Sequence, residues 1–192
     1  MPKRTAASYG DQLTGGTRDV NPQFMSGILT LSAANTATEV TLGTPIVRVG
    51  PQSDGHATIM ELLKIWVDYP AIDADAAAAT DRTMRFSAST TSSGGTPAVL
   101  SLDNPRVLTA MQMQLRNAFT AAGTGMLESS LQPQEFDFTD GAGHGVLVAT
   151  DNIFLQALTA GQAGASSFRW KILYRFKRVS LVEYIGIVQS QQ

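Results

Sequence analysis

Residues Ser167 to Lys177, SFRWKILYRFK, decide the fold class of this chain. Apolar residues occupy every second position, and most of the positions between them are basic. Successive side chains of a β-strand point to opposite faces of a sheet, so this period of two predicts a strand with one buried face. The face expected in the core carries Phe168, Trp170, Ile172, Tyr174 and Phe176. The opposite face carries Arg169, Lys171, Leu173, Arg175 and Lys177.

Signs of β-structure extend along the chain from Phe24 onward. In a second alternating segment, Met84, Phe86 and Ala88 oppose Thr83, Arg85 and Ser87. Elsewhere, short apolar runs are separated by clusters of Gly, Pro, Asn, Asp and Ser, which is typical of strands joined by turns. The predicted strands are Phe24–Leu31, Glu39–Leu42, Ile46–Val49, Thr58–Tyr69, Thr83–Ser89, Gln134–Phe138, Gly145–Thr150, Asn152–Leu158, Ser167–Phe176 and Leu181–Val188.

These strands predict an all-β fold: a single antiparallel β-sandwich with eight core strands and almost no helix. Two stretches leave their secondary structure open. Asp73–Asp81 is rich in alanine and fits either a loop or one or two helical turns. In the segment Leu108–Phe119, some apolar residues have helical spacing, whereas Met111, Met113 and Leu115 alternate. No repeat or linker is visible, so residues 23–192 are predicted to form one domain behind a flexible N-terminal arm, residues 1–22.

The composition argues against most enzyme classes. The 192 residues include no cysteine and only two histidines, His56 and His144, far apart in the sequence. This removes thiolate nucleophiles and the usual zinc sites. No nucleophile elbow or phosphate-binding glycine loop is present. We therefore expect no catalytic residue, no cofactor, no small-molecule substrate and no metal. Asp73, Asp75 and Asp81 leave open a calcium site, with a solvated loop as the more ordinary interpretation.

Charge is scarce in this sequence. Charged residues make up 16% of the chain and hydrophobic residues 43%, against about 25% charged residues in typical soluble domains. A surface that ends up inside subunit interfaces explains this, because interface cores are poor in charge. A β-protein kept in solution by neutral polar groups explains it as well. No signal peptide or run long enough for a membrane helix is apparent, so no membrane contact is expected.

The basic face of the strand Ser167–Phe176 is the one feature that suggests binding. The net charge of −2 is unfavourable for a nucleic-acid binder. Nevertheless, cations on one strand face recur about every 7 Å, a spacing that a phosphate backbone can follow. The predicted nucleic-acid contacts are Arg169, Lys171, Arg175 and Lys177, with Lys3 and Arg4 of the arm. The alternative is a solvated face whose cations pair with acidic residues of adjacent strands.

The ending SSFRWKILYRFKRVSLVEYIGIVQSQQ, preceded by DNIFLQALTAGQAG, resembles the terminal strands of single-jelly-roll capsid proteins of small circular single-stranded DNA viruses that encode a replication initiator. The resemblance covers roughly the last 45 residues. It implies two four-stranded sheets, self-assembly into an icosahedral shell, location in the virion, and a basic strand that faces the genome. The chain departs from this family in its arm, which has Lys3 and Arg4 instead of a long arginine-rich segment.

Two other functions stay open. One is a cupin-like metal enzyme, for which the chain lacks a histidine pair. The other is a non-viral binding module or phage decoration protein on a jelly-roll scaffold, because a fold alone does not decide function. A coat protein predicts particles, whereas a decoration or binding module predicts a monomer or a small oligomer.

Overall fold

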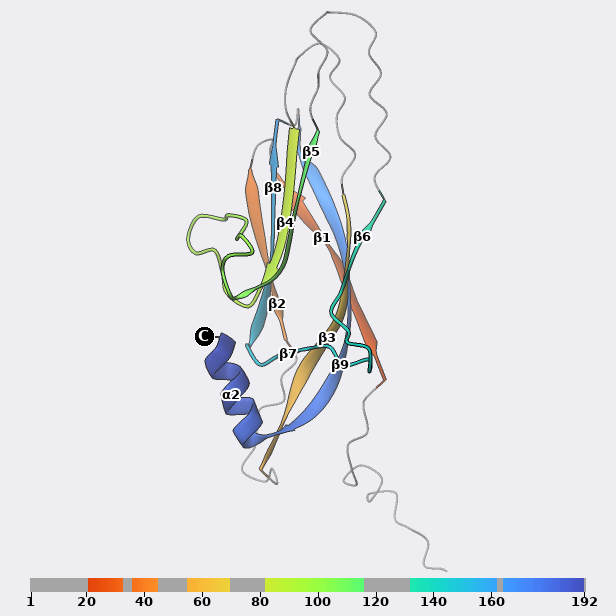
Figure 1. The fold of residues 1–192 in the computed structure, drawn as a ribbon. Helices are drawn as coiled ribbons and strands as arrows, with labels where there is room; N and C mark the ends of the chain where they lie inside the picture. The colour runs from red at the N-terminus through yellow and green to blue at the C-terminus, as the bar shows by residue number, and fades with distance from the viewer. Residues whose placement is uncertain are drawn as a thin grey trace, which may run out of the picture.

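The computed structural model describes residues 21–32, 36–44, 55–69, 82–115, 132–161 and 164–191. Within these ranges the chain forms nine β-strands and one helix (Figure 1). The strands are β1 (Gln23–Leu31), β2 (Ala37–Gly43), β3 (His56–Asp68), β4 (Arg82–Ser89), β5 (Val107–Leu115), β6 (Gln134–Asp137), β7 (Val146–Val148), β8 (Asn152–Ala160) and β9 (Ser166–Ser180). The helix α2 (Leu181–Gln191) follows β9 directly.

The strands build two antiparallel sheets. Sheet A has the order β1-β9-β3-β6, and β7 pairs with β3 farther along the same edge as β6. Sheet B has the order β2-β8-β4-β5. When β6 and β7 are counted as one interrupted strand, the pairing is nested. The first strand, β1, pairs with the last, β9; β2 pairs with β8; β3 pairs with β6 and β7; and β4 pairs with β5. This nested pairing is the strand order of a jelly roll, so the predicted all-β sandwich is confirmed.

The core lies between the inner faces of the two sheets. Sheet A contributes Leu29, Leu62 and Phe168, and sheet B contributes Phe86 and Leu155; all five are fully buried. Each buried side chain of this size stabilises the fold by about 1.5–3 kcal/mol. The predicted inner face of β9 is confirmed, because Phe168, Trp170, Ile172 and Tyr174 are buried and Phe176 packs partly buried against them.

Close packing between β1 and β9 depends on a glycine. Gly27 is the register partner of Trp170. A β-carbon at Gly27 would lie 2.6 Å from Cζ2 of the Trp170 ring. Only glycine therefore leaves room for this indole beside β1, which explains why a residue that usually weakens strands stands in the middle of one.

A β-bulge in β3 changes which of its residues face outward. The register with β9 shifts between Leu62 and Lys64, so Leu63 is an extra residue. Before the bulge, Glu61 shares the outer face of sheet A with its partner Arg175. After the bulge, Lys64, Trp66 and Asp68 face outward instead. This bulge is one reason why apolar residues of the run IMELLKIWVDY lie on both faces of sheet A.

Most of the predicted strands occur in the structure with small changes at their ends. The ambiguous segment after Leu108 is a strand as far as Leu115, because β5 pairs with β4 and places Met111 and Met113 against the core. The predicted strand Ile46–Val49 and the alanine-rich stretch Asp73–Asp81, with its three candidate calcium ligands, lie outside the described residues.

The prediction of a strand at Leu181–Val188 is wrong, because these residues belong to α2. Ser180 caps the helix by accepting a hydrogen bond from the Glu183 amide at 3.2 Å. The sequence Ser180-Leu-Val-Glu183 is a capping box, a signal for a helix start that period-two reasoning overlooked. Tyr184 and Ile187 then pack on Ala57, Ile59 and Val179 at one end of the outer face of sheet A.

Candidate nucleic-acid interface

The four cations predicted to contact nucleic acid all project from the outer face of β9. Their surroundings differ. The Arg169 side chain is 72% exposed and Lys171 is exposed, whereas the Arg175 side chain is only 14% exposed. Lys177 is intermediate, at 30%. Lys3 and Arg4, the two predicted contacts in the arm, lie outside the described residues.

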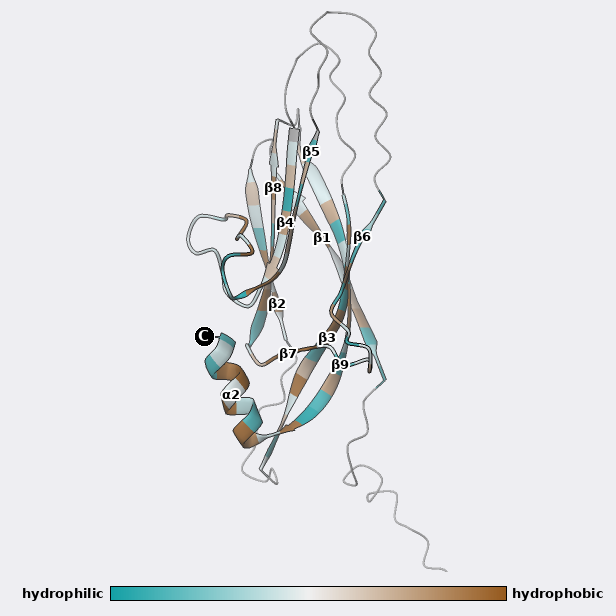
Figure 2. Cartoon of the chain, viewed as in Figure 1, coloured by the Kyte–Doolittle hydropathy of each residue, from teal (hydrophilic) through white to brown (hydrophobic). Residues whose placement is uncertain are grey.

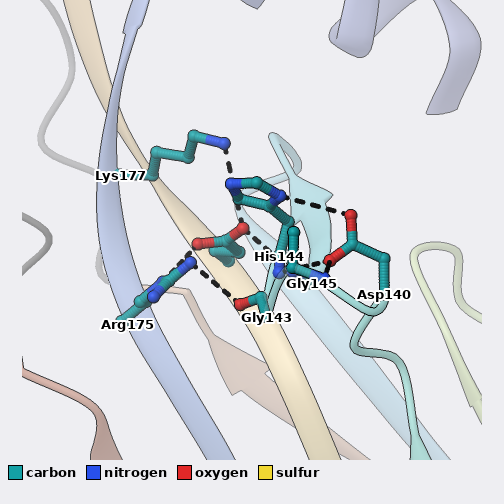
Figure 3. Close-up of polar contacts among 8 residues, drawn as sticks. Asp140, Gly143, His144, Gly145, Arg175 and Lys177 are labelled. Atoms are coloured by element: carbon teal, nitrogen blue, oxygen red, sulfur yellow. Dashed lines mark hydrogen bonds and ion pairs between the residues drawn. The ribbon is translucent and has the colours of Figure 1, made fainter.

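Arg175 and Lys177 converge on Glu61, a carboxylate with no exposed surface. Arg175 Nε donates a 2.5 Å hydrogen bond to Glu61 Oε2, and Lys177 Nζ lies 3.8 Å from Oε1. Figure 3 shows both side chains turned toward the loop that contains Asp140 and Gly143–Gly145. A buried carboxylate needs such partners, since an unpaired charge in the interior is strongly destabilising.

The loop between β6 and β7 closes over this ion pair. The Gly145 amide donates to Glu61 Oε1 at 2.9 Å, and Arg175 Nη2 donates to the Gly143 carbonyl at 3.1 Å. Gly145 has no room for a side chain, because a β-carbon there would lie 2.1 Å from the Leu62 carbonyl oxygen. Within the loop, Asp140 accepts the His144 amide at 2.8 Å and lies 3.2 Å from His144 Nδ1. Arg175 therefore joins β9 to β3 and to the loop between β6 and β7.

Two opposing effects act on the Glu61 carboxyl. Burial by itself raises the pKa of Glu61. The hydrogen bonds from Arg175 and the Gly145 amide, with the positive charges of Arg175 and Lys177, outweigh burial and lower the pKa of Glu61 below its ordinary value. Glu61 is therefore ionised at neutral pH and fully used as an acceptor.

The exposed half of this face holds Arg169 and Lys171, whose contacts differ from those of Arg175 and Lys177. Arg169 lies 3.6 Å from Asp68 across the β3–β9 register. Lys171 Nζ lies 4.1 Å from the centre of the Phe24 ring, and Phe24 lies 6.2 Å from Trp66. Among the described residues, Lys171 is the one of the four cations without a carboxylate partner. Cation–π contacts of this kind are weak when exposed, so Lys171 stays available to other groups.

Pairing with acidic residues of an adjacent strand was the alternative that the sequence left open, and it holds for three of the four cations. Arg169 pairs with Asp68, and Arg175 and Lys177 pair with Glu61. The sequence did not identify these two carboxylates, because they belong to β3, about a hundred residues before β9. Farther along this face, Lys64 contacts Glu135 at 2.5 Å and Asp137 at 2.8 Å, and Trp66 Nε1 donates to Glu135. Alternation in β9 shows which residues share a face, but it holds no information about the strand that lies beside them.

The outer face of sheet B is partly covered by the chain's own β4–β5 connection. Gln156, fully buried, donates to Glu39 at 2.9 Å and accepts from Ser87 Oγ at 2.7 Å and from the Leu100 amide at 3.2 Å. Glu39 also accepts bonds from Ser92 and Ser93. The connection is thereby held against the sheet, and Figure 1 shows it beside β4 and β2.

No group of three or more potential metal ligands occurs among the described residues. Of the two histidines, His144 pairs with Asp140, and His56 Nδ1 lies 3.3 Å from Arg178 Nη2. In the same part of the chain, no helix has the length and apolar character needed to cross a bilayer.

Strand order and core together give the described residues a jelly-roll fold. No protein-family model and no curated protein matches its sequence. Among solved structures it is similar to the VP1 pentamer of human polyomavirus 6, with 10% identity and a TM-score of 0.49, over 86% of this chain and 99% of that one.

Two further solved structures are similar. The Merkel cell polyomavirus virus-like particle has 8% identity and a TM-score of 0.49, over 94% of this chain and 81% of that one. Apo New Jersey polyomavirus VP1 has 8% identity and a TM-score of 0.45, over 82% of this chain and 100% of that one. At such low identity the function has to come from the residues of this chain.

Proposed function

We propose that this chain is a viral coat protein whose copies assemble into a closed icosahedral shell around nucleic acid. The observation that carries the proposal is a set of exposed apolar side chains on two separate surfaces of a jelly-roll domain. Phe24 and Ile28 are 57% and 60% exposed on sheet A, and Val182 and Ile185 are 82% and 48% exposed on α2. Together with the low charge, they fit a subunit whose surface becomes interface.

A finer assignment follows from the C-terminal resemblance described above. We place the chain with the coat proteins of small circular single-stranded DNA viruses, and its site of action in the virion. The competing function is a jelly-roll binding or decoration module that forms a monomer or a small oligomer. The two functions differ in the size of the assembly, not in the fold.

Purified chain is expected to form particles much larger than a trimer. A subunit with two different exposed apolar surfaces can pair one of them with the other surface of the next copy. This heterologous contact repeats until the assembly closes. Light scattering over a range of protein concentration, pH and salt, with electron microscopy of the largest fraction, measures this. Monomers or trimers under all conditions would favour the decoration or binding module and contradict the coat-protein proposal.

Genome contact belongs to the same proposal. Arg169 and Lys171, the exposed cations of β9, suit phosphate contact without base recognition, which lets a container accept any sequence. Arg175 and Lys177 are engaged by Glu61, so their share in such contact is expected to be smaller. The predicted contribution of all four cations, and of Lys3 and Arg4, stays a prediction.

The double variant Arg169→Gln/Lys171→Gln is expected to bind single-stranded DNA with a shallower salt dependence. Each lost phosphate contact lowers the slope of log affinity against log salt by about one unit. Filter binding of an oligonucleotide at several salt concentrations measures the slope. As a matched control, Arg85→Gln/Arg106→Gln removes two cations that lie away from β9. Equal slopes for both double variants and the original chain would show that this face does not contact nucleic acid.

A further inference from the structure

The chain exposes two apolar surfaces that differ in shape and charge. The first, called here the outer patch, consists of Phe24, Ile28, Trp66 and Lys171 on the outer face of sheet A. The second, called here the helix face, consists of Val182, Ile185, Gly186 and Gln189 of α2. Figure 2 shows hydrophobic residues along much of this helix. Exposed apolar side chains grouped in this way usually mark an interaction site.

The outer patch is concave beside its aromatic residues. A shallow hollow of about 200 Å³ is lined by Trp66, Asp68, Pro133, Arg169, Trp170 and Lys171. Phe24 and Ile28 project from β1 next to it. Because β1 is at the edge of sheet A, a partner can approach this face from the side. The hollow can therefore accept apolar side chains that another molecule presents.

The helix face carries an unexplained glycine. Gly186 stands in the middle of α2, where glycine weakens a helix. A β-carbon at this position would meet no atom within 4 Å, so no contact within the described residues requires a glycine there. Its absence of a side chain would let another backbone or a sheet face approach the helix closely. Val182 and Ile185 flank this position and point away from the residues that hold α2 to its own sheet.

Charges on the two surfaces are complementary. Glu183 is the one charged residue of α2, and it is exposed beside Val182. Lys171 is the cation of the outer patch, and its described contact is the Phe24 ring. The helix face cannot meet the outer patch of its own chain, because the opposite side of α2 packs on Ala57, Ile59 and Val179. A second copy of the chain presents an outer patch that this helix face can reach.

We propose that the helix face of one copy docks on the outer patch of the next copy, with Glu183 beside Lys171. This contact rests on the proposed self-assembly and names the surfaces that carry it. In the assembled shell Lys171 belongs to the contact between copies, which leaves Arg169 as the exposed member of the four predicted cations that can meet nucleic acid. It is heterologous, since each copy uses one surface as donor and the other as acceptor. Repetition of such a contact produces a ring or shell when the rotation between copies closes.

Charge reversal tests the contact. Lys171→Glu and Glu183→Lys are each expected to raise the protein concentration needed for half-assembly by about tenfold, a factor that corresponds to about 1.4 kcal/mol. Assembly is followed by light scattering after nuclease treatment, with nucleic acid removed, so that any role of Lys171 in genome contact does not enter. Unfolding curves of both variants should match the original chain, because both side chains are exposed.

Combining the two changes in one chain gives the sharper result. In the double variant Lys171→Glu/Glu183→Lys, every contact between copies again joins opposite charges, so this variant is expected to assemble like the original chain. An equal mixture of the two single variants is expected to recover only in part, because a ring with an odd number of copies keeps at least one like-charge contact. A helix-to-helix contact would instead leave Lys171→Glu unaffected. Val182→Ser should impair assembly, whereas Leu102→Ser, which changes an exposed leucine outside both surfaces, should not.

The outcomes separate this contact from the proposed function. If the original chain assembles while the single variants assemble equally well, or if the double variant does not recover, the contact is wrong and the coat-protein proposal stands. If the original chain assembles only when single-stranded DNA is added, and the double variant does not recover under those conditions, nucleic acid and not a second copy occupies the outer patch. An original chain that stays monomeric under every condition overturns both proposals.

Discussion

Replacing Glu61 with alanine is expected to lower the free energy of unfolding by about 3–5 kcal/mol. The substitution leaves Arg175 mostly buried without its carboxylate, and it leaves the Gly145 amide without its acceptor. The penalty comes from the groups left behind, because a buried charge or donor without a partner keeps its full desolvation cost. Urea unfolding at neutral pH, followed by tryptophan fluorescence, measures the difference.

Glu135→Ala serves as the matched control. It also removes a carboxylate from sheet A, but its partner Lys64 keeps Asp137 at 2.8 Å and both groups reach solvent. Surface ion pairs contribute little to stability, so this variant should unfold close to the original chain. Equal losses for Glu61→Ala and Glu135→Ala would contradict the view that burial makes the Glu61 pair critical.

The contribution of the Glu61–Arg175 ion pair to stability is expected to depend on pH. The pKa of Glu61 is lower in the folded chain than its ordinary value of 4.5. A carboxyl with a lowered folded pKa stabilises the fold above its unfolded pKa and loses that contribution as the pH falls through the folded pKa. The stability difference between the original chain and Glu61→Ala is therefore expected to shrink below about pH 4.5. A difference that stays constant down to pH 3 would show that folding does not lower the pKa of Glu61.

Phe168→Ala is expected to cost about 3–5 kcal/mol of unfolding free energy. Phe168 is fully buried between the sheets and meets Tyr69 edge-on, with ring centres 5.6 Å apart. Truncation leaves a cavity that the surrounding strands can fill only partly. Phe24→Ala makes the same chemical change on the neighbouring strand, where the ring is 57% exposed. In dilute, unassembled protein this control should change stability far less, and similar losses for the two variants would mean that the inner and outer faces are assigned the wrong way round.

Local sequence patterns were sufficient to predict much of the fold. Alternation in Ser167–Lys177 predicted the strand, its buried face and its basic face, because neighbouring side chains of any strand point to opposite sides. The breaker residues located β1, β2, β3, β4, β6 and β8 for the same local reason. The capping box Ser180-Leu-Val-Glu183 is also a local pattern, and it marks the start of α2 in competition with the apolar run that follows.

The tertiary structure alone decided the surroundings of the basic face. Whether Arg175 is a free cation or half of a buried pair depends on Glu61, which lies 114 residues away and comes alongside only when β3 pairs with β9. Glu61 and Lys64 are three positions apart, yet both face outward because the bulge at Leu63 inserts an extra residue between them. Alternation of apolar and polar residues does not reveal such an insertion. Docking of α2 on Ala57, Ile59 and Val179 likewise leaves Val182 and Ile185 exposed. Side-chain direction is a local property of the backbone, whereas charge partners and burial depend on which distant strand becomes the neighbour.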